Sequence, residues 1–261
     1  MPATARFTDE LLQRPEPGGL DVTTTLRHFA IVTYALAPAD LARHLHPRFT
    51  PDCIESVDGA RALLSVVPFL DVDFRLARLA RPRFSFGQTN YRAYVVDGET
   101  GERCVWFFGT CLGSWTVAVP RSLWRLPWHR GDVRFDCEWS NAERRYARYA
   151  MRTESAWASA RLELEDSGAP SEHLAGFPDL ETGMVVLTHP LAGYFRRRDG
   201  ELGTYRVWHE RLAATRATCL DAHFPLLERL ELVPREAQKA PHSVMLQREV
   251  GFTIYLPPRL A

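Results

Sequence analysis

Lysine is almost absent from this chain of 261 residues: Lys239 is the only one, and the other 31 basic residues are arginines. Arginine keeps its proton near neutral pH, so it can neither act as an amine nucleophile nor form a Schiff base with a carbonyl substrate. Lys239 lies in the polar stretch PREAQKAPH, which is typical of a loop. The sequence therefore argues against Schiff-base chemistry, including Schiff-base decarboxylation.

Paired cysteines and clustered metal ligands are also missing. The five cysteines are odd in number, widely spaced and without a CxxC pair, which favours reduced thiols over a disulfide framework or a zinc ribbon. His44 and His46 stand two residues apart in a predicted helix, where they point to different faces. We therefore expect no metal site and no other cofactor.

Net charge and long apolar runs are absent as well. Lys+Arg and Asp+Glu both number 32, so no overall field attracts nucleic acid or an anionic membrane. No stretch reaches the length of a membrane span, and the first thirty residues contain acids and prolines without an apolar run. G-x-S-x-G, H-E-x-x-H, P-loop and G-x-G-x-x-G motifs do not occur. These absences predict a cytoplasmic protein with no nucleic-acid or membrane partner.

Short segments rich in β-branched and aromatic residues dominate what is present. Residues 1–22 are polar and rich in proline and glycine, which predicts a flexible N-terminal arm before a single domain over 23–261. Strands are expected at about 26–35, 60–68, 84–96, 103–112, 113–119, 132–138, 144–152, 156–164, 204–219 and 242–258. Short helices are expected at about 38–47, 120–127, 186–196 and 221–231. The fold class is mainly β (α+β): a β-barrel or curved antiparallel sheet with a few peripheral helices.

One strand carries a row of polar side chains. Residues two apart share a face of a strand, so Gln88, Asn90, Arg92 and Tyr94 lie on the same side. A solvated sheet face is the simplest explanation of such a row. However, the next segment, VWFFGTCL, carries apolar side chains on both faces of its strand, which indicates a sheet covered on both sides. A covered polar row must be satisfied by partners or by a ligand.

Several of these segments together resemble a known family. The segments LRHFAIVTYALAPADLARHLHP, D-G-A-R with SVVPF, FxxTNYRAYVV, VWFFGTCL, V-A-V-P-R, Leu-Pro-Trp and PHSVML with FTIYLPP run from about Leu26 to Pro258. Their order resembles that of the YqjF-like domain of unknown function 2071 family, in the acetoacetate decarboxylase-like superfamily. The resemblance implies a barrel-like fold with a small-molecule pocket, and a possible homo-oligomer. Characterised relatives act on small keto acids through a lysine Schiff base.

The chain departs from the decarboxylase pattern at two places. Aligned with decarboxylases, the stretch RSLWRLPWH puts Trp128 and His129 where the reactive lysine and its lysine neighbour stand. Gln88 occupies the position of a carboxylate in the F-x-E-x-N-x-R pattern. An amide exchanges no proton near neutral pH. The nucleophile and its acid-base helper are therefore both expected to be missing.

These residues leave three functional hypotheses open. The first is a pocket protein that binds an anionic or carbonyl-bearing metabolite through Gln88, Asn90, Arg92, Tyr94, Trp128 and His129. The second is a lysine-independent lyase, isomerase or hydratase, with His129 as base and Arg92 as electrophile. The third is a structural or oligomeric scaffold. His189 and His209 are further candidates for a base, although packing explains them as well.

Overall fold

The computed structural model describes residues 4–261, apart from the side chains of Thr116 and Val119. Strands make up 54% of the chain and helices 14%, which confirms the predicted fold class. The strands are β1 (Val22–Leu36), β2 (Phe49–Pro51), β3 (Cys53–Ser56), β4 (Gly59–Leu76), β5 (Phe84–Asp97), β6 (Arg103–Leu112), β7 (Trp128–Arg130), β8 (Asp132–Ser140), β9 (Arg145–Glu154), β10 (Ala160–Pro170), β11 (Ala192–Arg196), β12 (Leu202–His209), β13 (Thr215–His223) and β14 (Ser243–Leu260).

Seven of these strands close into a barrel. Neighbouring strands follow the order β1-β4-β5-β6-β11-β12-β14, and β14 returns to pair with β1. Within this ring only β6 and β11 run parallel; the other pairs are antiparallel. Because the ring is closed, each of its strands has a paired neighbour on both sides. The ring therefore offers no free strand edge to which another chain could add.

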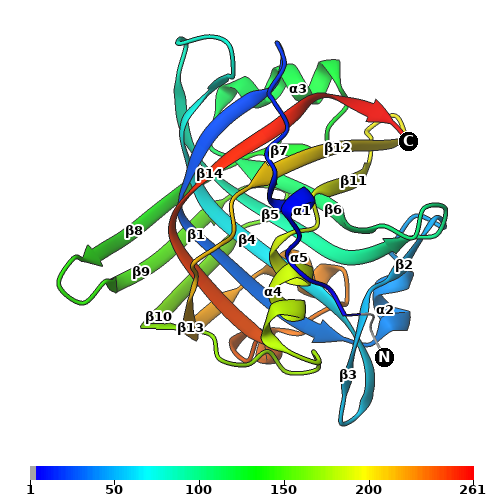
Figure 1. Cartoon of the computed structure of the whole chain (residues 1–261), viewed down its shortest axis with the longest axis vertical. Helices are drawn as coiled ribbons and strands as arrows, with labels where there is room; N and C mark the ends of the chain where they lie inside the picture. Colours follow the sequence, from blue (N-terminus) through cyan, green and yellow to red (C-terminus); the bar gives the residue numbers. More distant parts are fainter. Residues whose placement is uncertain (1–3) are drawn as a thin grey trace.

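The long strand β14 also belongs to a second layer. Beyond its barrel partners it pairs with β13, from which the sheet continues through β10 and β9 to β8. In Figure 1 the β8–β9 hairpin projects away from the barrel at the lower left. The layer covers one outer face of the barrel and buries large side chains against it, among them Tyr91, Tyr146, Tyr149 and Phe224. A separate apolar cluster fills the barrel interior.

Alternation along the strands decides which side chains enter each of these two cores. On β5, Tyr91 packs in the outer core and is fully buried, while Tyr94 packs in the interior cluster. On β4, Leu64 and Val66 face the outer core, while Leu63 and Val67 face the interior. Because side chains alternate between the two faces of a strand, those of the even-numbered residues of β5 point into the barrel.

Helices are short and lie around the barrel. They are α1 (Asp9–Leu12), α2 (Pro38–Ala42), α3 (Ala118–Leu123), α4 (Leu180–Thr188) and α5 (Pro225–Arg229), with 3-10 turns η1 (Trp115–Val117) and η2 (Arg235–Lys239). No helix within residues 4–261 is long and apolar enough to cross a membrane.

The part of the N-terminal segment that the structure describes lies against the domain. Arg6 donates two hydrogen bonds to the carboxylate of Asp179, at 2.6 and 2.7 Å. The Tyr255 hydroxyl donates to the Pro15 carbonyl oxygen at 2.8 Å. Both hydrogen bonds join residues that are distant in the sequence. The polar composition of residues 1–22, from which a flexible arm was predicted, therefore did not indicate them.

Several predicted elements differ from the observed ones. Residues 115–123 were expected to begin as a strand, but they form η1 and α3, and the helix starts before Pro120. The helix predicted at 186–196 is instead α4, which ends at Thr188, followed by strand β11. The strands predicted within 204–219 are present as β12 and β13, although β13 continues to His223. Short apolar runs fit either helix or strand locally, and pairing with distant segments decides between them.

Candidate functional site

The barrel interior contains a cavity of about 70 Å³. A water molecule needs about 10–15 Å³ of the same kind of volume, so the cavity has room for several waters or a slender small molecule. Its walls are mostly aliphatic and aromatic. Six polar side chains interrupt them: Asp71, Gln88, Asn90, Arg92, Thr188 and His209. A small number of polar groups in an apolar cavity is typical of a ligand site.

Strand β5 contributes a linked row of polar side chains to this wall. Asn90 Oδ1 accepts hydrogen bonds from Gln88 Nε2 and from the Thr110 hydroxyl, both at 2.8 Å. In this arrangement the Asn90 oxygen accepts both bonds, and the Asn90 amide nitrogen takes part in neither. The Asn90 Nδ2 group has no acceptor among the described residues. It therefore remains available as a donor beside Arg92.

Arg92 lies two residues further along β5. Its Nη2 atom donates to the Leu187 carbonyl oxygen at 3.1 Å and to the Tyr94 hydroxyl at 3.4 Å. Its Nε atom is buried without a hydrogen-bond partner, and no described carboxylate forms an ion pair with the guanidinium. A half-buried cation with no counter-ion is uncommon, since such charges are usually paired.

Tyr94 stands beneath Arg92 and does not line the cavity. Its ring lies 5.5 Å from the guanidinium carbon, within the range of a cation-π contact. Its hydroxyl lies 3.0 Å from the Leu187 carbonyl oxygen and 2.9 Å from the Ser65 hydroxyl. Tyr94 was predicted as a ligand contact, but the structure makes it a support that fixes the position of Arg92.

Trp128 and His129 face opposite sides of strand β7. Trp128 lines the cavity. The His129 ring stacks on Trp157, with centroids 4.1 Å apart and planes 6° from parallel, on the side away from the cavity. Burial, with Arg121 and Arg198 nearby, lowers the pKa of His129 to about 4. The expectation that both residues enter the pocket was wrong for His129, because adjacent residues of a strand cannot share a face.

Two histidines from the C-terminal third pack together, and one of them reaches the cavity. His209 lines it, whereas the ring of His189 lies behind, 4.3 Å from that of His209 between centroids. Both ring nitrogens of His209 lie 2.8 Å from backbone carbonyl oxygens, those of Glu210 and Thr188. Burial lowers the pKa of His209, while the hydrogen bonds to these two carbonyl groups act to raise it. His209 is thus held firmly by the backbone.

Asp71 on β4 is a lining residue that sequence reasoning missed. It is only 2% exposed, and its Oδ2 atom has no hydrogen-bond partner. Burial raises the pKa of its carboxyl group to about 7. The signal in the sequence is a carboxylate inside the apolar run SVVPFLDVDF, but the predicted strand ended at residue 68, whereas β4 continues to Leu76.

Lys239, the single lysine, lies in η2 outside the cavity lining. Its ammonium group forms an ion pair with Asp221 at 3.0 Å, and its side chain is 55% exposed. The described residues therefore place no amine in the cavity, as the composition predicted.

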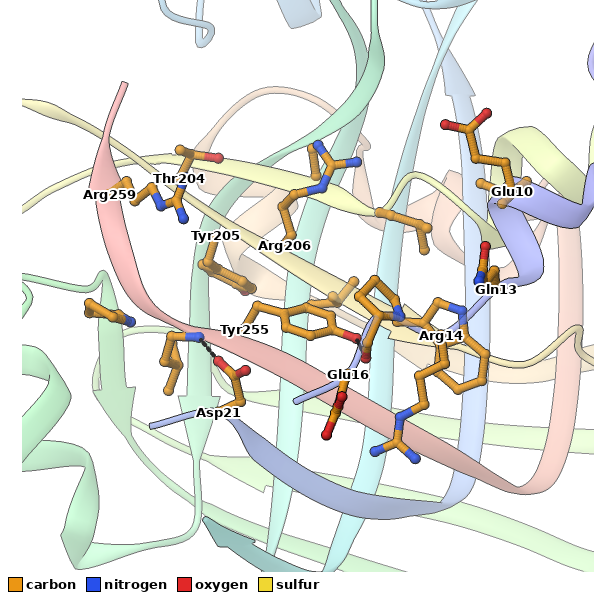
Figure 2. A pocket seen from close by; sticks show the side chains of 18 of the residues that line it. Glu10, Gln13, Arg14, Glu16, Asp21, Thr204, Tyr205, Arg206, Tyr255 and Arg259 are labelled. Carbon is orange, nitrogen blue, oxygen red and sulfur yellow. Dashed lines mark hydrogen bonds between the residues drawn. The ribbon is translucent and has the colours of Figure 1, made fainter. Parts of the chain in front are cut away.

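A larger hollow lies on the outside of the barrel. It is an open groove of about 1150 Å³ between the N-terminal segment and strands β12 and β14. Figure 2 shows charged side chains of both signs around it, including Glu10, Arg14 and Arg206, and the hydrogen bond from the Leu256 amide to Asp21. Tyr205, Val207 and Leu256 line both hollows, so the β12–β14 wall separates them. Two buried polar atoms without a partner, Arg92 Nε and Asp71 Oδ2, belong to residues of the inner cavity, against one in the groove lining, Trp208 Nε1, and the two in the inner cavity belong to ionisable side chains, which makes it the better candidate site.

Comparison with known structures agrees with this architecture. An acetoacetate decarboxylase from Legionella pneumophila superposes with a TM-score of 0.54 at 12% identity, over 97% of this chain and 94% of the other. An acetoacetate decarboxylase-like enzyme from Sphingomonas wittichii gives 0.58 at 12% identity, over 94% of each chain. The enduracididine biosynthesis enzyme MppR, with HEPES buffer bound, gives 0.52 at 13% identity, over 95% and 89%. Identities this low show a shared fold only.

No curated protein matches the sequence. The family model for domain of unknown function 2071, described as an uncharacterized conserved protein, matches residues 23–250. The chain therefore belongs to the domain of unknown function 2071 family, whose member here has an acetoacetate decarboxylase-like barrel.

Proposed function

We propose that the barrel cavity binds a metabolite through its carboxylate, without covalent attachment to the protein. The observation that carries this proposal is the Arg92 guanidinium, which lines the cavity with no carboxylate partner among the described residues. Arginine recognises a carboxylate with two parallel hydrogen bonds, and such charge-assisted bonds are strong.

The surroundings of Arg92 suit this role. Leu187 and Tyr94 occupy only Nη2, so Nε and Nη1 remain for a ligand. The free Nδ2 group of Asn90 adds a third donor from the same face of β5. Preformed donors of this kind reduce the entropy lost on binding.

The enzymatic alternative with His129 as base has no support from the geometry. The His129 ring stacks on Trp157 and does not line the cavity that contains Arg92. His209 does line it, but both of its nitrogens already face backbone carbonyl groups. The arrangement supports binding better than proton transfer by a histidine.

Thermal unfolding with a panel of carboxylates tests the proposal. Wild type is expected to gain several degrees in Tm from a ligand that fits, since binding to the native state alone raises its stability. Arg92→Ala is expected to remain folded and lose this gain, with at least a tenfold weaker affinity, because a hydrogen bond to a charged group contributes about 1.5–3 kcal/mol.

Arg27→Ala is the matched control, because Arg27 lies on β1 with a half-exposed side chain paired to Glu249. It should keep the ligand-induced shift. An equal shift in wild type and Arg92→Ala, for every carboxylate that binds, contradicts the proposal.

A further inference from the structure

Asp71 is a second buried polar group that faces the cavity. Its neighbours across the sheet are Leu26 on β1 and Phe86 on β5. No arginine, lysine or histidine within residues 4–261 forms an ion pair with it. Among the side chains that the structure describes, only that of Thr24 lies within hydrogen-bond distance, with its hydroxyl 3.0 Å from Asp71 Oδ1. A carboxyl group in such apolar surroundings normally has its remaining oxygen bonded.

The Thr24 hydroxyl does not satisfy this carboxyl group fully. It has one proton, and it lies 3.0 Å from Asp71 Oδ1 and 3.1 Å from the Val72 carbonyl oxygen. When the Thr24 hydroxyl donates to the Val72 carbonyl oxygen, a hydrogen bond between Thr24 and Asp71 requires a proton on the Asp71 carboxyl group. In either arrangement Oδ2 is left without a partner. A buried oxygen without a hydrogen-bond partner lowers the stability of the folded protein, and a ligand that bonds to this oxygen removes the cost.

Asp71 and Arg92 stand at different ends of the cavity. On the paired strands Arg92 lies opposite Ser65, and Asp71 follows further along β4. At a rise of 3.2–3.4 Å per residue, the two positions are separated by at most about 20 Å along the strand. Apolar side chains, including Val67, Phe69 and Phe107, line the space between them.

We infer, on the basis of the proposed function, that Asp71 is the second polar contact of the ligand. The ligand is then a slender molecule with a carboxylate at one end, an apolar chain and a hydroxyl group at the other end. Arg92 and Asn90 hold the carboxylate, and Asp71 Oδ2 meets the hydroxyl.

A hydroxyl group suits Asp71 better than a charged group does. The pKa of Asp71 is raised to about 7 by burial, so both protonation states are populated near neutral pH. A hydroxyl can accept from the protonated form and donate to the ionised form. An ammonium group fits only the ionised form, and a carboxylate fits only the protonated one.

Calorimetric titration with two matched series tests this inference. The probes are unbranched carboxylates of increasing chain length, from butanoate upward, and their ω-hydroxy counterparts, from 4-hydroxybutanoate upward. Wild type is expected to prefer the hydroxylated probe by roughly tenfold at the chain length that spans the cavity, the value of one well-made hydrogen bond. The preference should persist on both sides of neutral pH.

Asp71→Val should bind the unsubstituted carboxylate and lose the preference for the hydroxylated one. Asp73→Asn is the matched control, since Asp73 lies on the same strand with a half-exposed side chain and should keep the preference. Melting curves check that each variant is folded, and Asp71→Ala serves if the valine variant is not.

The outcomes separate the two proposals. An unchanged preference in Asp71→Val, or no preference in wild type at any chain length that binds, overturns the role of Asp71 and leaves Arg92 in place. Equal binding of the carboxylates by wild type and Arg92→Ala, or no binding of any of them, overturns the proposed function and this inference together.

Discussion

The buried carboxyl group of Asp71 makes the stability of the protein depend on pH in a specific way. Its folded-state pKa is about 7, whereas that of a fully hydrated aspartate side chain is 3.8. Because the folded state holds this proton more tightly than the unfolded state, stability attributable to Asp71 falls as the pH rises from about 4 to about 7. Above that range the loss is constant.

The size of this effect follows from the shift. A shift of about three pKa units corresponds to roughly 4 kcal/mol, at 1.36 kcal/mol per unit. Asp71→Asn keeps the shape of the side chain and removes the ionisation. We therefore expect the variant to be more stable than wild type by up to about 4 kcal/mol above neutral pH, and by less than about 1 kcal/mol near pH 4.

Urea denaturation of both proteins across this pH range gives the difference in unfolding free energy directly. The subtraction removes the contributions of other titrating groups that the two proteins share. Asp73→Asn, at a half-exposed position on the same strand, should show no comparable trend. A difference between wild type and Asp71→Asn that does not change with pH would refute the assignment of a raised pKa to Asp71.

Two further predictions concern charged groups outside the cavity. Arg48→Ala should lower the free energy of unfolding by about 3–5 kcal/mol in urea titrations, because Arg48 donates to both oxygens of the fully buried Asp97 at 2.7 and 2.6 Å; a loss below 1 kcal/mol contradicts this. Arg48 holds the pKa of Asp97 well below its usual range, so the loss should disappear only in strong acid. Lys239→Gln should change the unfolding free energy by no more than about 1 kcal/mol and leave carboxylate binding unchanged, since the Lys239 side chain is half-exposed and Arg161 still pairs with Asp221; weaker binding in this variant contradicts the assignment of the site.

Local patterns were sufficient for most of the strands that build the barrel, although not for β11, which lies in a segment predicted as a helix, and for one wall of the cavity. Alternation along β5 placed Gln88, Asn90 and Arg92 on a single face, and all three line the cavity. Alternation is a property of the strand itself, so it needs no knowledge of the neighbours. The same rule would have separated Trp128 from His129 if the short strand β7 had been recognised. That strand exists because it pairs with β6, which the local sequence does not indicate.

The sequence alone determined that Lys239 is the one lysine available for any amine chemistry, because the count of lysines does not depend on the fold. Only the tertiary structure decided that Tyr94 supports Arg92 through Leu187, and that Asp71 Oδ2 is left without a partner. Both facts depend on tertiary packing, which brings α4 against β5 and β1 against β4, strands that are distant in the sequence. Burial and hydrogen-bond satisfaction are set by such distant neighbours, whereas the direction of a side chain along a strand is set by the strand.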